Sequence, residues 1–188
     1  MIESIRQFLL HPKETGGIES SDELAELITD IPNLASAKSV VELGPGTGVF
    51  TERVIAKAPK RCRFFCIETN GHFSRVIAEK YPYVRVYRDS AINIRKYLAM
   101  NGLRECDVII SGLPWASFEE DFQEQLLQEI RKSLKKGGEF LTFSYVQSML
   151  LPAAKNFRAL LHENFSEVRK TYTVWKNLPP AFVYHCRK

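Results

Sequence analysis

The sequence predicts an α/β protein in which helices cover both faces of a doubly wound, mostly parallel sheet. The first observation is an apolar strand at 38–43 that runs through the glycine-rich turn 44–48 directly into a helix. The second is that further apolar strands alternate with amphipathic helices, as parallel sheets require. The third is the length of 188 residues with 45% apolar content, which suits one compact domain and leaves little room for a second.

We expect the main domain, at 31–188, to follow a helical extension over residues 1–30. Residues 2–10 place apolar side chains on one helical face, and Pro12 ends that helix. Two interpretations remain open for this segment. The helix packs on its own domain as a lid, or it docks on an anionic membrane surface through residues 1–13.

The remaining elements follow from hydrophobic periodicity and from turn residues. Capping patterns at Ser20-x-x-Glu23 and Ser117-x-x-Glu120 open two of the helices, and Gly137-Gly138 ends the second of these. The predicted helices lie at 20–29, 49–58, 73–81, 92–100, 117–136 and 150–163. Seven strands are predicted, at 38–43, 62–67, 84–87, 107–110, 140–145, 167–175 and 181–186.

The turn at 177–180 limits how the last two strands can be arranged. A parallel crossover needs a dozen residues or more, and this turn is far shorter. The two strands therefore pair antiparallel or have another strand between them.

Composition narrows the class of protein further. The formal charge of +4 is mildly basic and well below that of a nucleic-acid scaffold. The N-terminus lacks a signal-peptide pattern, and no apolar run is long enough to span a bilayer. The cysteines and histidines show no metal-ligand spacing, so no metal site is expected. We expect a cytoplasmic protein, or one bound peripherally to the cytosolic face of a membrane.

The glycine turn indicates a nucleoside cofactor. A dinucleotide fingerprint counted from Gly44 would need a third glycine at position 49, where the chain has Val49. Glu68 ends the second strand, where a carboxylate accepts both hydroxyls of a ribose. Asp89 ends the third strand, where an adenine amino group would lie. We expect Glu42 to tether the turn by accepting backbone N–H groups.

These acids meet at one edge of the sheet because the carboxyl ends of parallel strands lie together. An acid-rich edge without a placed lysine or arginine suits S-adenosylmethionine, which is a cation without a pyrophosphate. We predict that this cofactor contacts Glu42, Gly44, Pro45, Gly46, Thr47, Gly48, Glu68, Thr69, Asp89, Ser90 and Ser111.

At this point the chain resembles a known family. Residues 40–115 resemble the class I S-adenosylmethionine-dependent methyltransferases, a Rossmann-like family whose seven-stranded sheet has an antiparallel last strand. Most of the chain resembles bacterial phospholipid N-methyltransferases, relatives of the ribosomal RNA adenine dimethylases. The narrower resemblance rests on Ser111-Gly112-Leu113-Pro114 and Asn177-Leu178-Pro179-Pro180-Ala181. It implies N-methylation of the phosphatidylethanolamine head group, with an amine-bearing phospholipid as substrate.

The acceptor side is predicted from the residues that follow the fourth strand. Ser111 and the carbonyl of Gly112 or Leu113 would orient an alkyl amine. Trp115 and Tyr145 would offer aromatic faces to a methylated ammonium. Adenine N6-methyltransferases carry Asn or Asp where this chain has Ser111, which argues against methylation of nucleic acid.

Three alternatives to the lipid hypothesis remain open. The first is an RNA adenine N6-methyltransferase, which would be expected to add a C-terminal RNA-binding domain. The 43 residues after Tyr145 leave no room for such a domain. The others are a methyltransferase for a small soluble amine and a non-catalytic cofactor-binding or lipid-binding module. The sequence indicates no oligomeric state.

Overall fold

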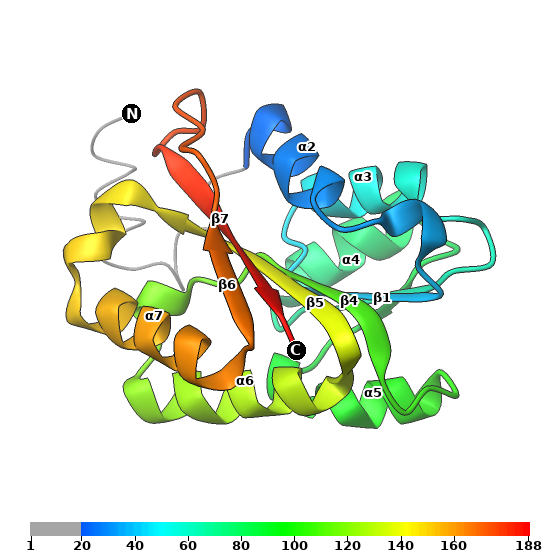
Figure 1. The fold of residues 1–188 in the computed structure, drawn as a ribbon. Coiled ribbons are helices and arrows are strands. Elements are labelled where there is room, and N and C mark those ends of the chain that lie inside the picture. The colour runs from blue at the N-terminus through cyan, green and yellow to red at the C-terminus, as the bar shows by residue number, and fades with distance from the viewer. Residues whose placement is uncertain (1–19) are drawn as a thin grey trace.

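A seven-stranded sheet with the order β3-β2-β1-β4-β5-β7-β6 forms the centre of the computed structural model, which describes residues 20–188 (Figure 1). β7 runs antiparallel to both of its neighbours, and the other strands run parallel. The predicted fold class is therefore confirmed. The strands are β1 (Ser39–Leu43), β2 (Arg63–Ile67), β3 (Arg85–Tyr87), β4 (Cys106–Ser111), β5 (Leu134–Tyr145), β6 (Glu167–Lys170) and β7 (Ala181–Arg187).

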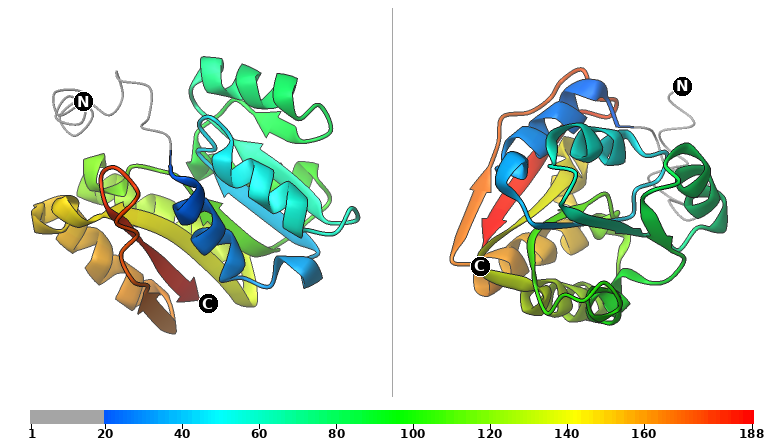
Figure 2. Two further views of the ribbon diagram at one scale, coloured as in Figure 1. Left: turned by 90° about the horizontal axis from the view of Figure 1, so that it is seen from above. Right: turned by 90° about the vertical axis from the view of Figure 1, so that its right-hand side faces the viewer.

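Helices cover both faces of this sheet, giving three layers (Figures 1 and 2). One layer contains α2 (Asp22–Asp30), α3 (Val49–Lys57) and α4 (Gly71–Lys80). The opposite layer contains α5 (Ile94–Met100), α6 (Glu120–Ser133) and α7 (Pro152–Asn164). Because both faces are covered, all five residues of β1 are buried, which explains its continuous apolar run.

The parallel arrangement positions the site. β1, β2, β3, β4 and β5 all end at the same edge of the sheet, so the turns that follow them lie close together. β6 ends at this edge as well, and β7 begins there because it runs in the opposite direction.

Several element boundaries differ from those predicted. α6 begins after Glu119 rather than after Ser117, and it ends at Ser133. β5 begins at Leu134 because the chain resumes pairing with β4 early, through a register shift. The left-handed Gly137 (φ 73°) lies inside this strand instead of ending a helix. β6 ends at Lys170, with only a single bridge further along the chain.

The N-terminal predictions are tested only in part. Ser21, one residue later than expected, caps α2 by accepting a hydrogen bond from the Leu24 backbone N–H (3.2 Å). Leu24 and Ile28 of α2 are buried in the same apolar cluster as Val40 of β1. The predicted helix at 2–10 and the membrane contact through 1–13 lie outside the described residues, so the division at residue 30 stays a prediction. Between residues 20 and 188, no helix has both the length and the apolar character needed to cross a bilayer.

Candidate active site

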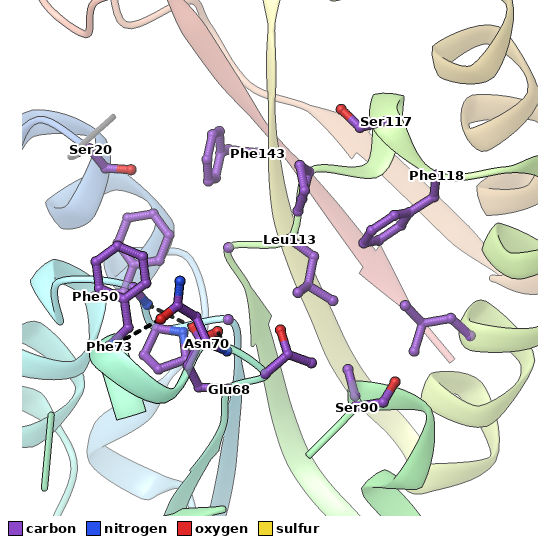
Figure 3. A pocket seen from close by; sticks show the side chains of 18 of the residues that line it. Ser20, Phe50, Glu68, Asn70, Phe73, Ser90, Leu113, Ser117, Phe118 and Phe143 are labelled. Atoms are coloured by element: carbon purple, nitrogen blue, oxygen red, sulfur yellow. Dashed lines mark hydrogen bonds between the residues drawn. The ribbon is translucent and has the colours of Figure 1, made fainter. Parts of the chain in front are cut away.

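A cavity of about 690 Å³ opens at the carboxyl edge of the sheet. Its walls come from the turns after β1, β2, β3 and β4 and from the end of β5. Figure 3 shows Glu68 and Asn70 at one end and Phe118 and Leu113 across from them. Ten predicted site residues line it: Gly44, Pro45, Gly46, Thr47, Glu68, Thr69, Ser90, Gly112, Leu113 and Tyr145.

The glycine turn forms one end of the cavity. Gly46 adopts a left-handed φ of 55°, and a Cβ added to it would meet nothing within 4 Å. The backbone of the turn is therefore open to a ligand at the beginning of α3. The positive end of the α3 dipole makes such a position favourable for electronegative groups of a ligand.

Glu68 is held beside this turn. Its carboxylate accepts hydrogen bonds from the backbone N–H groups of Asn70 (2.8 Å) and Gly46 (3.3 Å). An ionised carboxylate offers about four acceptor positions, so two remain for a ligand. This arrangement suits the predicted contact with two ribose hydroxyls.

Glu42 lies behind the turn and does not line the cavity. It is fully buried and accepts hydrogen bonds from the Thr51 hydroxyl (2.7 Å) and the Cys66 thiol (3.6 Å). Burial raises the pKa of Glu42 from 4.5 to about 7, although both hydrogen bonds favour the charged form. Glu42 therefore links β1 to α3 and β2. Gly48, which caps α3, also lies outside the cavity wall.

Asp89 differs from its predicted role. Its carboxylate accepts hydrogen bonds from the Tyr97 hydroxyl (2.7 Å), the Ser90 backbone N–H (2.7 Å) and the Asn93 amide (3.0 Å). These bonds hold the pKa of Asp89 well below its usual range. The side chain stabilises the start of α5 instead of lining the cavity, where Ser90 and Ala91 lie.

Ser111 and Trp115 also differ from prediction. Both are buried, and the Trp115 indole donates to the Ser111 hydroxyl (3.2 Å). The Trp115 ring stacks on Phe157 of α7 at a centroid distance of 4.3 Å. Apolar burial against α7 therefore directs Trp115 into the core. The acceptor amine would instead meet the neighbouring Gly112 and Leu113.

Gly112 is needed at its position for steric reasons. A Cβ at position 112 would collide with the carbonyl oxygen of Gly44. The Gly112 backbone N–H donates to the Leu43 carbonyl (2.8 Å). The turns after β1 and β4 thus meet backbone to backbone, which fixes the glycine turn relative to Gly112 and Leu113.

The part of the cavity around Phe143 and Tyr145, where the sequence predicts the methyl acceptor and which we call the acceptor end, has aromatic walls that sequence reasoning missed, except for Tyr145. Phe50 and Phe143 meet edge to face at 5.9 Å, and Phe143 meets Tyr145 at 5.4 Å between centroids. Phe118 and Phe122 also line the cavity. Burial raises the pKa of Tyr145 to about 12, so its hydroxyl stays protonated at neutral pH. Periodicity had indicated only that these side chains face inward.

Gln123 is a second missed residue. Its side-chain amide donates to the carbonyls of Trp115 (2.7 Å) and Ala153 (3.1 Å). It thereby fixes the turn after β4 against α7 from a buried position on α6. A polar residue on the apolar face of that helix was the available signal.

The similar proteins agree with this geometry, although no family model matches the chain. An ornithine lipid N-methyltransferase of Singulisphaera acidiphila is 29% identical over 155 residues, covering 81% of this chain and 77% of that protein. A ribosomal RNA small subunit methyltransferase A of Wolbachia pipientis is 29% identical over 118 residues, covering 59% and 42%.

Solved structures establish the fold. The O-methyltransferase TomG of Streptomyces achromogenes, in complex with SAM, superposes with a TM-score of 0.72 at 15% identity, over 100% of this chain and 88% of that one. The chain has the class I S-adenosylmethionine-dependent methyltransferase fold. With the two relatives above, this confirms the predicted class of enzyme, a methyltransferase, and its cofactor, S-adenosylmethionine.

The geometry divides this methyltransferase's cavity into two ends. One end suits the nucleoside of the cofactor. There the glycine turn leaves its backbone open, Glu68 can accept hydrogen bonds from ribose hydroxyls, and Ser90 lines the wall. The aromatic end beyond Gly112 is left for the methyl acceptor. The individual residue contacts stay predictions.

Proposed function

We propose that the enzyme methylates the amine of a membrane lipid head group, with phosphatidylethanolamine as the predicted substrate. The observation that carries this proposal is the acceptor end of the cavity. The cavity combines aromatic and apolar walls with two carboxylates, those of Glu68 and Glu119, which are its charged lining side chains within residues 20–188. Such a lining suits an amine attached to an apolar molecule, because the carboxylates attract its ammonium form and the apolar walls hold the neutral form after its proton has passed to solvent.

An N-methyltransferase must present a neutral amine, whereas a free alkyl amine has a pKa of about 10. The rings of Phe50, Phe143 and Tyr145 exclude water from the acceptor end. Desolvation of this kind lowers the pKa of an ammonium group and favours loss of its proton. S-adenosylmethionine, when bound, supplies an electrophilic methyl group.

The chain's own residues then orient the amine. Gly112 and Leu113 line the cavity, which supports the proposal that one of their carbonyls accepts a hydrogen bond from the amine. The contact of Gly112 with the Gly44 turn fixes the distance between the two ends. Positioning of this kind contributes much of the catalysis when the leaving group departs without a proton.

The aromatic faces also favour the methylated products. A quaternary ammonium is attracted to an aromatic face by roughly 0.5–2 kcal/mol. Phe143 lies against Tyr145, which is predicted for this role, whereas Trp115, predicted with it, stacks on Phe157 in the core. Successive methyl transfers to one nitrogen are therefore compatible with this wall.

The similarity to an ornithine lipid N-methyltransferase supports an aminolipid as acceptor, and it makes ornithine lipid a second candidate. The similarity to a ribosomal RNA methyltransferase keeps RNA as the competing acceptor. One experiment separates them. The protein is incubated with methyl-labelled S-adenosylmethionine and an equimolar mixture of phosphatidylethanolamine vesicles, ornithine lipid vesicles and unmethylated ribosomal RNA.

We expect the label in the lipid extract, with thin-layer chromatography assigning it to one of the two lipids. Label in RNA but not in lipid would refute the proposal. A heat-denatured sample controls for chemical methylation. A soluble amine such as ethanolamine, added alone, tests whether the apolar part of the acceptor is required.

A further inference from the structure

Exposed apolar side chains gather beside the mouth of the cavity. Seven large apolar side chains are exposed in the described part of the chain, and five of them belong to two short segments. One segment follows β5 and includes the 3-10 helix η4 (Val146–Leu150). The other is the turn 171–180 between β6 and β7. We call these five side chains the apolar rim: Leu150, Leu151, Tyr172, Trp175 and Leu178.

The two segments lie side by side at the carboxyl edge of the sheet (Figures 1 and 2). The Val146 backbone N–H donates to the Pro180 carbonyl (2.9 Å). The Lys170 ammonium at the end of β6 lies 3.7 Å from the Met149 sulfur. These contacts place the β6–β7 turn against the segment that follows Tyr145.

The same turn borders the cavity. The Ser21 backbone N–H donates to the Asn177 side chain (2.8 Å), and the preceding Ser20 lines the cavity. On the other side, Val146 follows directly after Tyr145, which also lines the cavity. The apolar rim is therefore continuous with the entrance to the acceptor end.

The turn is rigidly held, so the exposure of its apolar side chains is built into the fold. Asn177 is buried and its amide donates to the Pro179 carbonyl (2.6 Å). Val174 is buried and pairs with Ala181. Trp175, which lies between Val174 and Asn177, is 71% exposed, and Leu178, which lies between the bonded Asn177 and Pro179, is 57% exposed. Exposing an indole on an ordered turn is unfavourable in water and indicates an interaction surface.

Charge identifies the partner. Residues 140–162 and 168–188 contain no Asp or Glu. Lys155, Lys170 and Lys176 lie in or beside the segments that carry the apolar rim. Tryptophan and leucine next to lysines are the combination that enters the interface of an anionic bilayer.

We propose that the apolar rim docks the enzyme on an anionic lipid bilayer, with the mouth of the cavity facing the membrane. This surface is distinct from the N-terminal segment 1–13. The inference rests on the proposed function in one respect, because it explains how a lipid acceptor enters the cavity without leaving the bilayer. Trp175 and Leu178 insert at the boundary between head groups and acyl chains. The Lys176 ammonium lies 3.8 Å from the Glu23 carboxylate, and its side chain is 87% exposed, so it can contact lipid phosphates as well.

The test uses the two tryptophans of the chain, Trp115 in the core and Trp175 on the rim. Vesicles of phosphatidylglycerol and phosphatidylcholine are prepared with lipids brominated near the head-group boundary. We expect them to quench tryptophan emission of the full-length protein. In Trp175→Phe, which keeps only the buried Trp115, the quenching should disappear.

Affinity for vesicles is measured in parallel by co-sedimentation. The double variant Trp175→Ser/Leu178→Ser should bind anionic vesicles at least about tenfold more weakly than the wild type. Lys176→Glu should weaken vesicle binding to a similar extent. The matched control is Tyr83→Ser/Met100→Ser. These side chains are 72% and 59% exposed but lie before β3 and before β4, at the opposite edge of the sheet. The control should bind as the wild type does.

Methyl transfer to phosphatidylethanolamine in detergent micelles separates this inference from the proposed function. Loss of transfer to bilayer lipid, but not to micellar lipid, in Trp175→Ser/Leu178→Ser would support both. Micellar transfer without quenching of Trp175 by brominated vesicles would overturn the docking surface alone. Quenching of Trp175 without methyl transfer to any lipid would support the docking surface and would refute the proposal that the acceptor is a lipid. Self-association through the rim, seen as a doubled mass with no quenching, would also overturn the inference.

Discussion

Replacing Glu68 with alanine should weaken binding of S-adenosylmethionine at least about a hundredfold. Two acceptor positions of the Glu68 carboxylate are occupied by the backbone N–H groups of Asn70 (2.8 Å) and Gly46 (3.3 Å). The two that remain would accept the ribose hydroxyls. A hydrogen bond to a charged group contributes about 1.5–3 kcal/mol, so losing two costs about 3 kcal/mol or more. Each 1.4 kcal/mol corresponds to a tenfold change in Kd.

Calorimetric titration with S-adenosylmethionine measures this effect directly. Glu79→Ala, on the exposed side of α4, removes the same charge away from the cavity and should leave Kd unchanged. The Kd of Glu68→Gln should lie between those of Glu68→Ala and Glu79→Ala. Its amide keeps one acceptor oxygen, but its NH₂ group cannot accept a hydrogen bond from the second backbone N–H. A Kd for Glu68→Ala within about threefold of the wild-type value, in a protein with unchanged Tm, would refute the ribose contact.

Three further predictions concern the walls of the site. Glu42 has a pKa of about 7 in the native state, against 4.5 for an ordinary glutamate, so the native state binds the proton more tightly than the unfolded state does. The free energy of unfolding should therefore fall by about 3 kcal/mol as the pH rises from about 4.5 to about 7. Denaturant titrations of Glu42→Gln should show a flatter pH profile, and an unchanged profile would contradict this assignment. Gly112→Ala should lower the free energy of unfolding by roughly 1–3 kcal/mol, because the new Cβ meets the Gly44 carbonyl. The control is Gly71→Ala, where the new Cβ displaces only a flexible arginine side chain. Equal losses of unfolding free energy in the two variants would argue against the backbone contact. Tyr145→Leu should reduce kcat/KM for the amine by about two- to thirtyfold, because it removes the aromatic face. Tyr145→Phe keeps that face and should keep most of the activity. An equal loss of kcat/KM in the two variants would exclude a role for the ring.

The sheet and the end of the cavity that carries the glycine turn and Glu68 were predictable, because each depends on local sequence signals. The run Val40-Val41 followed by the turn 44–48 identifies a buried strand that passes into a helix at a ligand site. Glu68 follows from its position at the end of the next strand, since parallel strands bring their carboxyl ends together. The early start of β5 was not predictable, because the pairing of Leu134 with Cys106 is a tertiary contact.

The acceptor end was harder to predict for the same reason. Ser111 and Trp115 follow β4 in sequence, but stacking of Trp115 on Phe157 turns the indole into the core. The wall that replaces it combines Phe50 from α3 with Phe143 and Tyr145 from β5. Alternation along β5 indicates which residues share a face. It does not show which helix residue meets them.

The central claim is that the enzyme methylates a membrane aminolipid, and a lipid profile of living cells tests it most directly. The protein is expressed in a bacterium whose membranes contain phosphatidylethanolamine and ornithine lipid but no methylated forms, and the extracted lipids are analysed by mass spectrometry. We expect mono-, di- or trimethylated head groups in cells with the wild-type protein and none in cells with Glu68→Ala. Unmethylated lipids in cells that contain folded wild-type protein able to bind S-adenosylmethionine would contradict it.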